Sequence, residues 1–323
     1  MNQTIFSALQ PSGKLHLGNY LGALKNFLEL QEKYNCFFFI ADYHSITEDY
    51  NYKEKPKQIF DLALDFLAIG LDPKKCAIAV QSQIPEHTEL AWIFNTITPV
   101  SELERMTQFK DKASRQKKNI NMGLFDYPVL QAADILVYKA DKVPVGQDQI
   151  QHIELTRKIA RLFNNKFGEV FPEPEPLLTE TPKIMSLTDP TKKMSKSHGA
   201  KSYIGINDEP EVINKKLRKA ISTTAYDKSI YNFYETLLER FGTEKNKEYF
   251  DKQFKNKNIK FSELKEALAG DISNYFASFR AKRKELEARP DYVKEVLLEG
   301  AEKARTIARE TMKEVKKKIG LVL

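Results

Sequence analysis

The stretch Asp189–Ser197 is a short polar loop that carries three lysines and two serines. Lysine ammonium groups are compact point charges, and serine hydroxyls and backbone N–H groups supply further donors. Because the residues are small, these groups can converge on one polyanion. This lysine loop is therefore a candidate phosphate site, although its composition alone fits a solvated basic turn equally well.

A second candidate, the N-terminal loop Pro11–Asn19, contains two glycines and His16. It lies between an expected strand and an expected helix, where backbone N–H groups and the helix dipole favour an anion. It is not a P-loop, since Gly18 is followed by asparagine rather than by lysine and a hydroxyl residue. Gly18 would let an adenine or a ribose approach the backbone, and His16 could donate to a phosphoryl oxygen. Taken alone, the loop also fits a plain turn that starts a helix.

The elements expected around these loops alternate between strands and helices. Apolar runs predict the strands, and apolar residues at helical spacing predict the helices between them. Such alternation is typical of a parallel sheet with crossover helices, in which ligands bind beyond the carboxyl ends of the strands. The expected strands are Ile5–Leu9, Cys36–Ala41, Ala77–Val80 and Val143–Val145, the expected helices include 56–70, 87–98, 101–112 and 127–139, and the proline-rich segment Phe171–Pro176 is expected to be a turn-rich connection.

From about residue 208 onward, strand signals disappear, and the segments 209–221, 229–241, 262–288 and 291–318 show helical spacing. This part predicts a helical bundle. The fold class expected for the chain is α/β, with a Rossmann-like parallel-sheet domain over residues 1–200 and an all-helical domain over residues 201–323.

Composition and charge fit a globular protein of two domains, with 323 residues of which 41% are hydrophobic. The longest apolar run, Cys36–Ala41, is too short to span a membrane, and the first residues show no secretory signal. Cys36 and Cys76 lack the spacing of metal ligands, so we expect buried thiols in a reducing cytoplasm. Residues 198–323 contain 27 lysines and arginines against 20 acidic residues, whereas residues 1–197 are balanced. This excess favours a polyanionic partner, or else a solvated lysine-rich surface.

Two signatures and several flanking stretches link the sequence to one enzyme family. Lys193–Ser197 reads Lys-Met-Ser-Lys-Ser, the KMSKS signature of class I aminoacyl-tRNA synthetases, and Pro11–Asn19 resembles their HIGH signature. Over about residues 4–200 the sequence is similar to bacterial tryptophanyl-tRNA synthetases. The stretches that carry this resemblance are Pro11–Gly13, Gly18–Asn19, Glu102–Lys110, Ala132–Leu136, Pro144–Gln149 and Ile184–Leu187.

The resemblance implies a two-step reaction on ATP, tryptophan and tRNA. The tryptophan carboxylate attacks the α-phosphorus, Mg-pyrophosphate leaves, and the acyl group passes to the terminal adenosine of tRNA. Such chemistry needs positioning and charge neutralisation more than a covalent nucleophile. The catalytic residues that the resemblance implies are His16, Lys193 and Lys196. The ATP-binding residues that it implies are Gln10, Pro11, Ser12, Gly18, Asn19, Gly146, Gln147, Asp148, Ile184, Met194, Ser195 and Ser197 together with the two lysines, and Lys112 is a further phosphate candidate.

For the amino acid, the most informative residue is Asp134, a carboxylate inside the apolar run Leu130–Tyr138. The indole of tryptophan has one polar group, an N–H donor, so its pocket needs a buried acceptor. Without the resemblance, Asp134 would also fit the solvent side of an amphipathic helix. Gln131 stands where the family often has methionine, and it either shares the indole N–H or turns away. The other contacts that the resemblance implies are Tyr127 and Gln149 at the α-amino group, and Phe6, His44, Val143 and Val145 as pocket walls.

The partners implied by the resemblance are tRNA(Trp), L-tryptophan and ATP with Mg²⁺, with residues 201–323 as the domain that binds the tRNA anticodon. It implies a cytoplasmic homodimer with no DNA or membrane partner, no metal ligands among its side chains, and no zinc or iron–sulfur site. We further expect the two signature loops to close on one ATP from opposite ends of the sheet domain. The alternatives are a tyrosyl-tRNA synthetase, an adenylyltransferase such as pantothenate synthetase, and a synthetase-like RNA-binding protein without catalysis.

Overall fold

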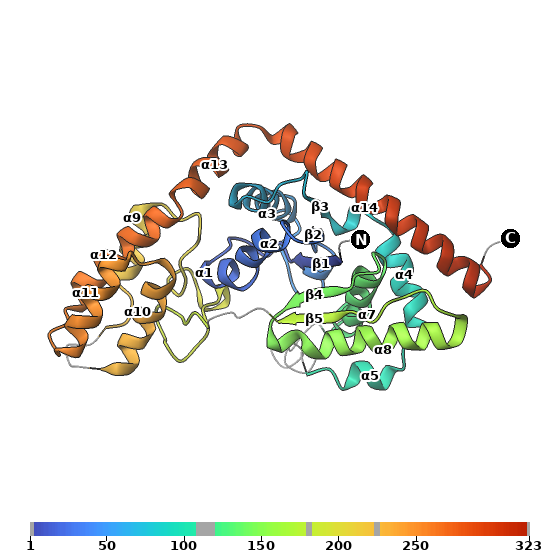
Figure 1. The fold of residues 1–323 in the computed structure, drawn as a ribbon, viewed down its shortest axis with the longest axis horizontal. Helices are drawn as coiled ribbons and strands as arrows, with labels where there is room; N and C mark the ends of the chain where they lie inside the picture. Colours follow the sequence, from blue (N-terminus) through green and yellow to red (C-terminus); the bar gives the residue numbers. More distant parts are fainter. Residues whose placement is uncertain (1–2, 108–119, 179–182, 223–226, 322–323) are drawn as a thin grey trace. The chain divides into compact units, whose positions relative to one another are not determined.

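The computed structural model describes residues 3–107, 120–178, 183–222 and 227–321. They form two compact units. The sheet unit comprises Met1–Gly13, Asn26–Glu180 and Leu286–Leu323, and the helical unit comprises Lys14–Lys25 and Thr181–Glu285 (Figure 1). This division differs from the one predicted at residue 200, because the end of the chain belongs with the sheet and part of the N-terminal loop does not.

A parallel five-stranded sheet in the order β3-β2-β1-β4-β5 forms the centre of the sheet unit. Its strands are β1 (Thr4–Leu9), β2 (Asn35–Ile40), β3 (Cys76–Val80), β4 (Lys142–Val145) and β5 (Glu175–Leu178). Strands β2 and β3 read as continuous apolar runs, because both of their faces are covered. The predicted α/β class with a Rossmann-like parallel sheet is confirmed.

Strand β5 lies where the sequence predicted a turn-rich connection. Pro176 stands opposite Val143 of β4, and the parallel pairing continues to Leu178. A proline is tolerated here because β5 is an edge strand, whose outward side needs no N–H for the sheet. The proline-rich composition therefore hid a strand.

Helices cover both faces of this sheet. The helices are α2 (Lys25–Leu30), α3 (Lys55–Ile69), α4 (Glu86–Asn95), α5 (Val100–Glu104), α7 (Met122–Leu136) and α8 (Ile150–Phe167), with short turns η2 (His44–Ile46), η3 (Gln81–Gln83) and η4 (Gln147–Gln149). On one face, Phe6 and Phe39 share a core with the buried side of α4, α7 and α8. On the other face, Phe38 stacks on Phe27 of α2 with ring centroids 4.3 Å apart. Of the helix expected over 101–112, the structure describes α5, and residues 108–112 lie outside the described residues.

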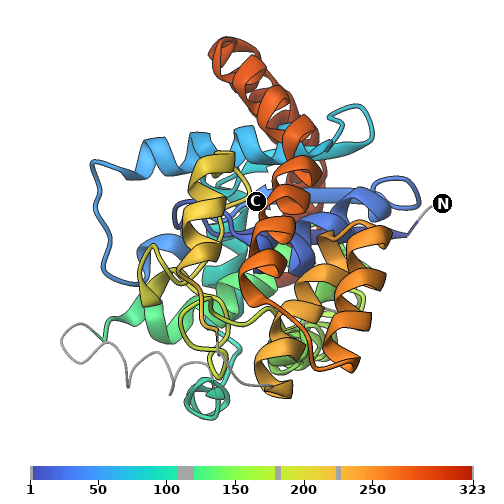
Figure 2. The same cartoon turned by 90° about the vertical axis from the view of Figure 1, so that its left-hand side faces the viewer.

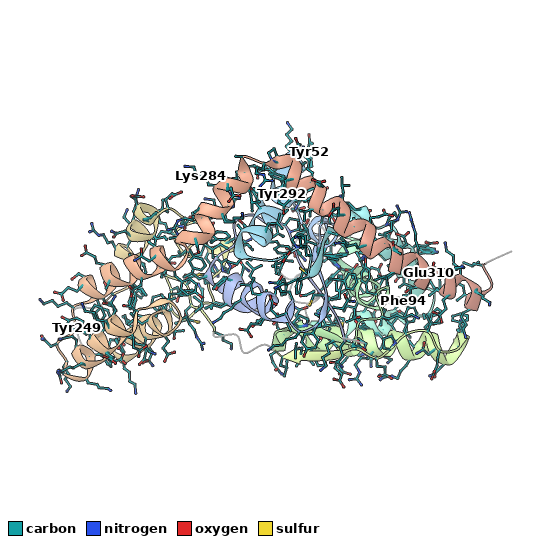
Figure 3. The ribbon with its side chains drawn as sticks, turned by 45° about the horizontal axis from the view of Figure 1, so that its top comes forward. Tyr52, Phe94, Tyr249, Lys284, Tyr292 and Glu310 are labelled. Carbon is teal, nitrogen blue, oxygen red and sulfur yellow. The ribbon has the colours of Figure 1, made fainter. Side chains whose placement is uncertain are left out.

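The long helix α14 (Pro290–Ile319) packs along β3 within the sheet unit (Figure 1). Figure 3 labels Glu310 on this helix. Gly300 permits this approach, since a Cβ at that position would lie 2.0 Å from the carbonyl oxygen of Ile78. The ion pairs that join α14 to α4 include Arg305–Glu86, Arg309–Glu86 and Lys316–Glu89. The last helix therefore belongs to the sheet unit and not to the separate helical domain predicted for it.

The helical unit contains α1 (Leu17–Asn19), η1 (Tyr20–Leu24), η5 (Lys196–His198), α9 (Pro210–Arg218), α10 (Lys228–Phe241), α11 (Glu244–Lys255), α12 (Phe261–Tyr275) and most of α13 (Ala277–Glu287). Helices α9 and α10 both pack on α12 (Figure 2). Tyr234 in this core is fully buried and donates its hydroxyl to the carbonyl of Ile221. The segment expected as one helix over 262–288 is divided at Phe276, and α11 was not predicted. None of the helices in the described part of the chain is both long and apolar enough to cross a membrane.

Candidate active site

Backbone hydrogen bonds join the N-terminal loop to the segment that follows the lysine loop. Leu17 N donates to Ile204 O at 3.1 Å, and Ile206 N donates to Leu15 O at 3.0 Å. His16 therefore stands opposite Gly205 in an antiparallel bridge. Lys14–Asn19 and the lysine loop thus belong to one unit. This arrangement differs from the prediction that the two signature loops lie at opposite ends of the sheet domain.

His16 is buried and held by reciprocal hydrogen bonds with Asn19. Its Nδ1 accepts from the Asn19 N–H at 3.3 Å, and the Asn19 Oδ1 accepts from the His16 N–H at 3.1 Å. Because Nδ1 accepts, the hydrogen of the neutral ring lies on Nε2, which is then a donor. Burial, followed by the positive charges of Lys196 and Lys193, lowers the pKa of His16 to about 4. Near pH 7, His16 is therefore a neutral donor.

The lysine loop is fixed by pairing with the chain just before it. Met194 N donates to Ile184 O at 2.8 Å, and both side chains are buried. The same pairing leaves Lys193 exposed and Lys196 partly exposed. The positive charges of both lysines act on the His16 ring, and the three predicted catalytic residues lie in the helical unit. The side chain of Ser197 lies outside the described part of the structure.

Asp208 supports this region, although it was not among the predicted residues. Its carboxylate accepts from Gly205 N at 2.8 Å and from Lys216 Nζ at 2.5 Å. Lys216 also lies over the ring of Tyr203, whose centroid is 5.8 Å from that of His16. In the sequence, Asp208 precedes Glu and Pro at an expected helix start, so nothing local distinguishes it from an ordinary helix-starting residue.

In the sheet unit, Asp134 on α7 is 1% exposed and has hydrogen bonds with three side chains. His44 Nε2 lies 2.7 Å from Oδ2, and His87 Nδ1 lies 2.5 Å from Oδ1. Gln81 Nε2 donates to both oxygens, at 2.8 and 2.9 Å. On the other side of the His87 ring, Nε2 lies 2.6 Å from the hydroxyl of Tyr138. We call these five residues the Asp134 network.

The protonation states of this network follow from its charges. Burial by itself raises the pKa of Asp134, but its electrostatic interactions and hydrogen bonds with His87 and His44 outweigh burial and lower the pKa below its usual range. Burial, together with the negative charges of Asp134 and Glu86, raises the pKa of Tyr138 well above its usual value. Near pH 7, Asp134 is therefore a buried acceptor, and the Tyr138 hydroxyl keeps its hydrogen.

The network lies where the fold class places ligands. His44 and Gln81 follow the carboxyl ends of β2 and β3, the neighbouring strands of the sheet. His87 and Tyr138 come from α4 and from the residues after α7. Gln81, His87 and Tyr138 were not predicted. Gln81 and His87 are far from Asp134 in the sequence, and the sheet topology brings them to it, whereas Tyr138 ends the same apolar run as Asp134 and looks like an ordinary core residue.

The other predicted tryptophan contacts also lie in the sheet unit. The Tyr127 hydroxyl lies 2.9 Å from His152 Nε2, and the Tyr127 ring centroid is 6.2 Å from that of His44. Gln131, one helical turn before Asp134, is partly exposed. No described residue makes a hydrogen bond with its side-chain amide. The buried strand residues Phe6, Val143 and Val145 fit pocket walls and ordinary core equally well.

The remaining ATP candidates follow the carboxyl ends of β1 and β4. Gln10 and Ser12 are exposed after β1, and Lys55, which was not predicted, donates from Nζ to Pro11 O at 3.2 Å. After β4, Gln147 and Asp148 are exposed, and Gln149 Nε2 donates to Asp148 Oδ2 at 3.2 Å. A Cβ at Gly146 would lie 2.8 Å from Asp148 Oδ1, so the exposed Asp148 side chain would have to move for any other residue. Lys112 lies outside the described residues.

Known proteins resemble this chain over its whole length. The family model described as tRNA synthetases class I (W and Y) matches residues 2–277. A tryptophan–tRNA ligase of Rickettsia conorii is 46% identical over 332 residues, and the match covers 100% of this chain and 100% of that protein. One from Caldanaerobacter subterraneus subsp. tengcongensis is 43% identical, over 99% of this chain and 98% of its own length. The crystal structure of a Campylobacter jejuni tryptophanyl-tRNA synthetase complexed with ADP and tryptophan has a TM-score of 0.89 at 36% identity, and covers 98% of this chain and 99% of its own.

Proposed function

The chain belongs to the class I tRNA synthetases of the tryptophan and tyrosine group, and from this premise we propose that it is a tryptophan–tRNA ligase. It activates L-tryptophan with Mg–ATP, releases pyrophosphate, and transfers the tryptophanyl group to the terminal adenosine of tRNA(Trp). The names of its full-length relatives support tryptophan over tyrosine, and they disfavour an RNA-binding protein without catalysis.

The observation that carries the chemistry is the His16 ring of the helical unit, which burial and the charges of Lys196 and Lys193 keep neutral. In this proposal the two lysines neutralise the charge that grows on the leaving pyrophosphate. The Nε2–H of His16 donates to a phosphoryl oxygen, a task that a neutral ring with a fixed tautomer can perform. Ile184 and Met194, hydrogen-bonded to each other, bind the nucleotide beside the lysines.

Asp134 accepts the indole N–H in this proposal. A carboxylate has about four acceptor positions. His44 and His87 use one each, and Gln81 Nε2 contacts both oxygens, so in this proposal the indole N–H takes the place of one Gln81 contact. A hydrogen bond to a charged group contributes about 1.5 to 3 kcal/mol. Gln131, one turn earlier on α7, is a second acceptor for the same N–H. Tyr127 and Gln149 bind the α-amino group.

Charge supports the helical unit as the tRNA-binding part. Its residues 14–25 and 181–285 contain 24 lysines and arginines against 14 acidic residues, a balance of +10. The sheet unit contains 27 against 30, a balance of −3. A polyanion is attracted to the basic unit, and its binding weakens as the salt concentration rises. A homodimer in the cytoplasm completes the proposal.

The test is ATP/pyrophosphate exchange that depends on the amino acid, followed by charging of tRNA. The purified chain is assayed with tryptophan, with tyrosine and without amino acid, and then for transfer of labelled tryptophan to tRNA(Trp). We expect exchange with tryptophan and charging of that tRNA. Exchange with tyrosine instead would overturn the amino-acid assignment, and a lack of exchange with every amino acid would overturn the enzymatic function.

A further inference from the structure

Two buried side chains stand behind Asp134 in a single row of hydrogen bonds. Tyr138 is 3% exposed and His87 is fully buried. The Tyr138 hydroxyl lies 2.6 Å from His87 Nε2, and His87 Nδ1 lies 2.5 Å from Asp134 Oδ1. The row ends at the carboxylate that, in the proposed function, accepts the indole N–H.

The row determines which atoms donate. If the Tyr138 hydroxyl donates to Nε2, the neutral His87 ring carries its hydrogen on Nδ1, which faces Asp134. In the other tautomer, a lone pair on Nδ1 would face the carboxylate oxygen and repel it. The tyrosine hydroxyl thereby favours the tautomer that binds Asp134.

Orientation of the carboxylate matters because its last torsion angle has broad, two-fold preferences. Donors on both oxygens hold the plane of the group: His87 acts on Oδ1, and His44 acts on Oδ2. Aromatic packing holds the row itself, since Tyr138 is stacked on Phe6 with centroids 5.6 Å apart. With the plane fixed, the acceptor positions of the Asp134 oxygens point in fixed directions.

We propose that His87 and Tyr138 are positioning residues for tryptophan, which hold the Asp134 carboxylate in the orientation that accepts the indole N–H. The pair sets the preference for an amino acid that carries a ring N–H. This inference rests on the proposed function, because it requires tryptophan to be the substrate.

The experiment compares two substrates that differ at the indole nitrogen. The first is tryptophan, and the second is 3-benzothienylalanine, in which sulfur replaces the ring N–H. The KM of each is measured by ATP/pyrophosphate exchange for the wild type and for Tyr138→Phe. We expect Tyr138→Phe to raise the KM of tryptophan about fivefold, the usual worth of one hydrogen bond, and to change the KM of the sulfur analogue less than about twofold.

A second pair of variants keeps the test decisive if Tyr138→Phe does not fold. His87→Asn retains a side-chain N–H close to the position of Nδ1, whereas His87→Leu has no donor. We expect His87→Asn to keep most of the preference for tryptophan over the sulfur analogue, and His87→Leu to lose it. Equal preferences in these two variants would overturn the proposal.

Tyr234→Phe is the matched control, since it also removes a buried tyrosine hydroxyl, one that donates to a backbone carbonyl in the helical unit. It should leave the ratio of the two KM values unchanged. A purely structural role of Tyr138 would raise both KM values equally and would overturn the positioning role. A wild type that shows no exchange with tryptophan would overturn the proposed function itself. A wild type that prefers tryptophan, together with a Tyr138→Phe variant that prefers it as strongly, would overturn only the inference.

Discussion

The two sites of this protein present charge in opposite ways. In the helical unit, the charges assigned to phosphate are the ammonium groups of Lys193 and Lys196, which are exposed or partly exposed on a loop. In the sheet unit, the charge assigned to the indole is the Asp134 carboxylate, which is 1% exposed and held by three side chains. The lysine charges are accessible to water, whereas the Asp134 carboxylate is buried.

The difference follows from what each site must bind. A triphosphate brings several full charges, and pyrophosphate has to leave again, so exposed lysines can neutralise the charge without trapping the product. An indole N–H brings only a partial charge. Its acceptor discriminates well when it is desolvated and fixed, because an amino acid without the N–H then leaves a buried acceptor without its partner. We infer that the helical unit is built for rate and the sheet unit for selection.

The largest expected effect is on the rate of adenylate formation in Lys196→Ala. Removing one group that stabilises charge in the transition state costs about 10²- to 10³-fold in rate. We expect a single-turnover adenylation rate lower by this factor, with tryptophan affinity nearly unchanged. Lys201→Ala, which removes an exposed lysine outside the signature, is the control. If tryptophan affinity fell as much as the rate, the division between rate and selection would be wrong.

The next effect is on tryptophan binding in Asp134→Asn. Loss of a hydrogen bond to a charged acceptor corresponds to a KM for tryptophan about ten- to a hundredfold higher. The KM for ATP should remain close to that of the wild type. Asp126→Asn changes another carboxylate of the same helix, one that accepts from Asn95, and serves as the control. If the KM for tryptophan did not change, Asp134 would not be the acceptor of the indole N–H, and Gln131 would be the remaining candidate.

The smallest effect concerns the proton affinity of His16. An NMR titration of its ring should show a pKa near 4 in the wild type, and Lys196→Ala should raise that pKa because one positive neighbour is lost. The folded-state pKa lies below the ordinary value of 6.5, so the fold disfavours the protonated ring. This group therefore leaves stability unchanged above about pH 6.5 and destabilises the fold as pH falls from there toward 4. A wild-type titration near 6.5 would show that neither burial nor the lysine charges lower the pKa of His16, and an unchanged pKa in Lys196→Ala would show that this charge does not reach the ring.

Local patterns predicted the parts of the fold and site that depend on neighbouring residues. The apolar runs of β1 to β4 and the KMSKS letters are of this kind, and the family resemblance is confirmed by full-length relatives. The patterns did not predict β5, because Pro176 and the prolines just before it indicate a turn-rich connection, although one proline is tolerated in an edge strand. Nor did they place α14, since its return to β3 depends on Gly300 and on ion pairs with α4, over 200 residues away in the chain.

The Asp134 network shows the same limit within the site. Asp134 was predicted because a carboxylate in an apolar run is locally unusual, and the resemblance named His44. Gln81, His87 and Tyr138 carry no such local signal, since each is a single polar residue on an otherwise ordinary element. The order of the strands brings Gln81 and His87 to the carboxylate, whereas Tyr138 lies four residues after Asp134 in the chain.

The central claim, that the helical unit controls the rate and the sheet unit selects the amino acid, is tested most directly by a double-mutant cycle. The value of kcat/KM for tryptophan in adenylate formation is measured for the wild type, Lys196→Ala, Asp134→Asn and the double variant. If the two residues act on different reactants, their effects should add to within about 0.5 kcal/mol. A coupling energy above about 1 kcal/mol would contradict the claim, because residues in one shared network are expected to couple at that level.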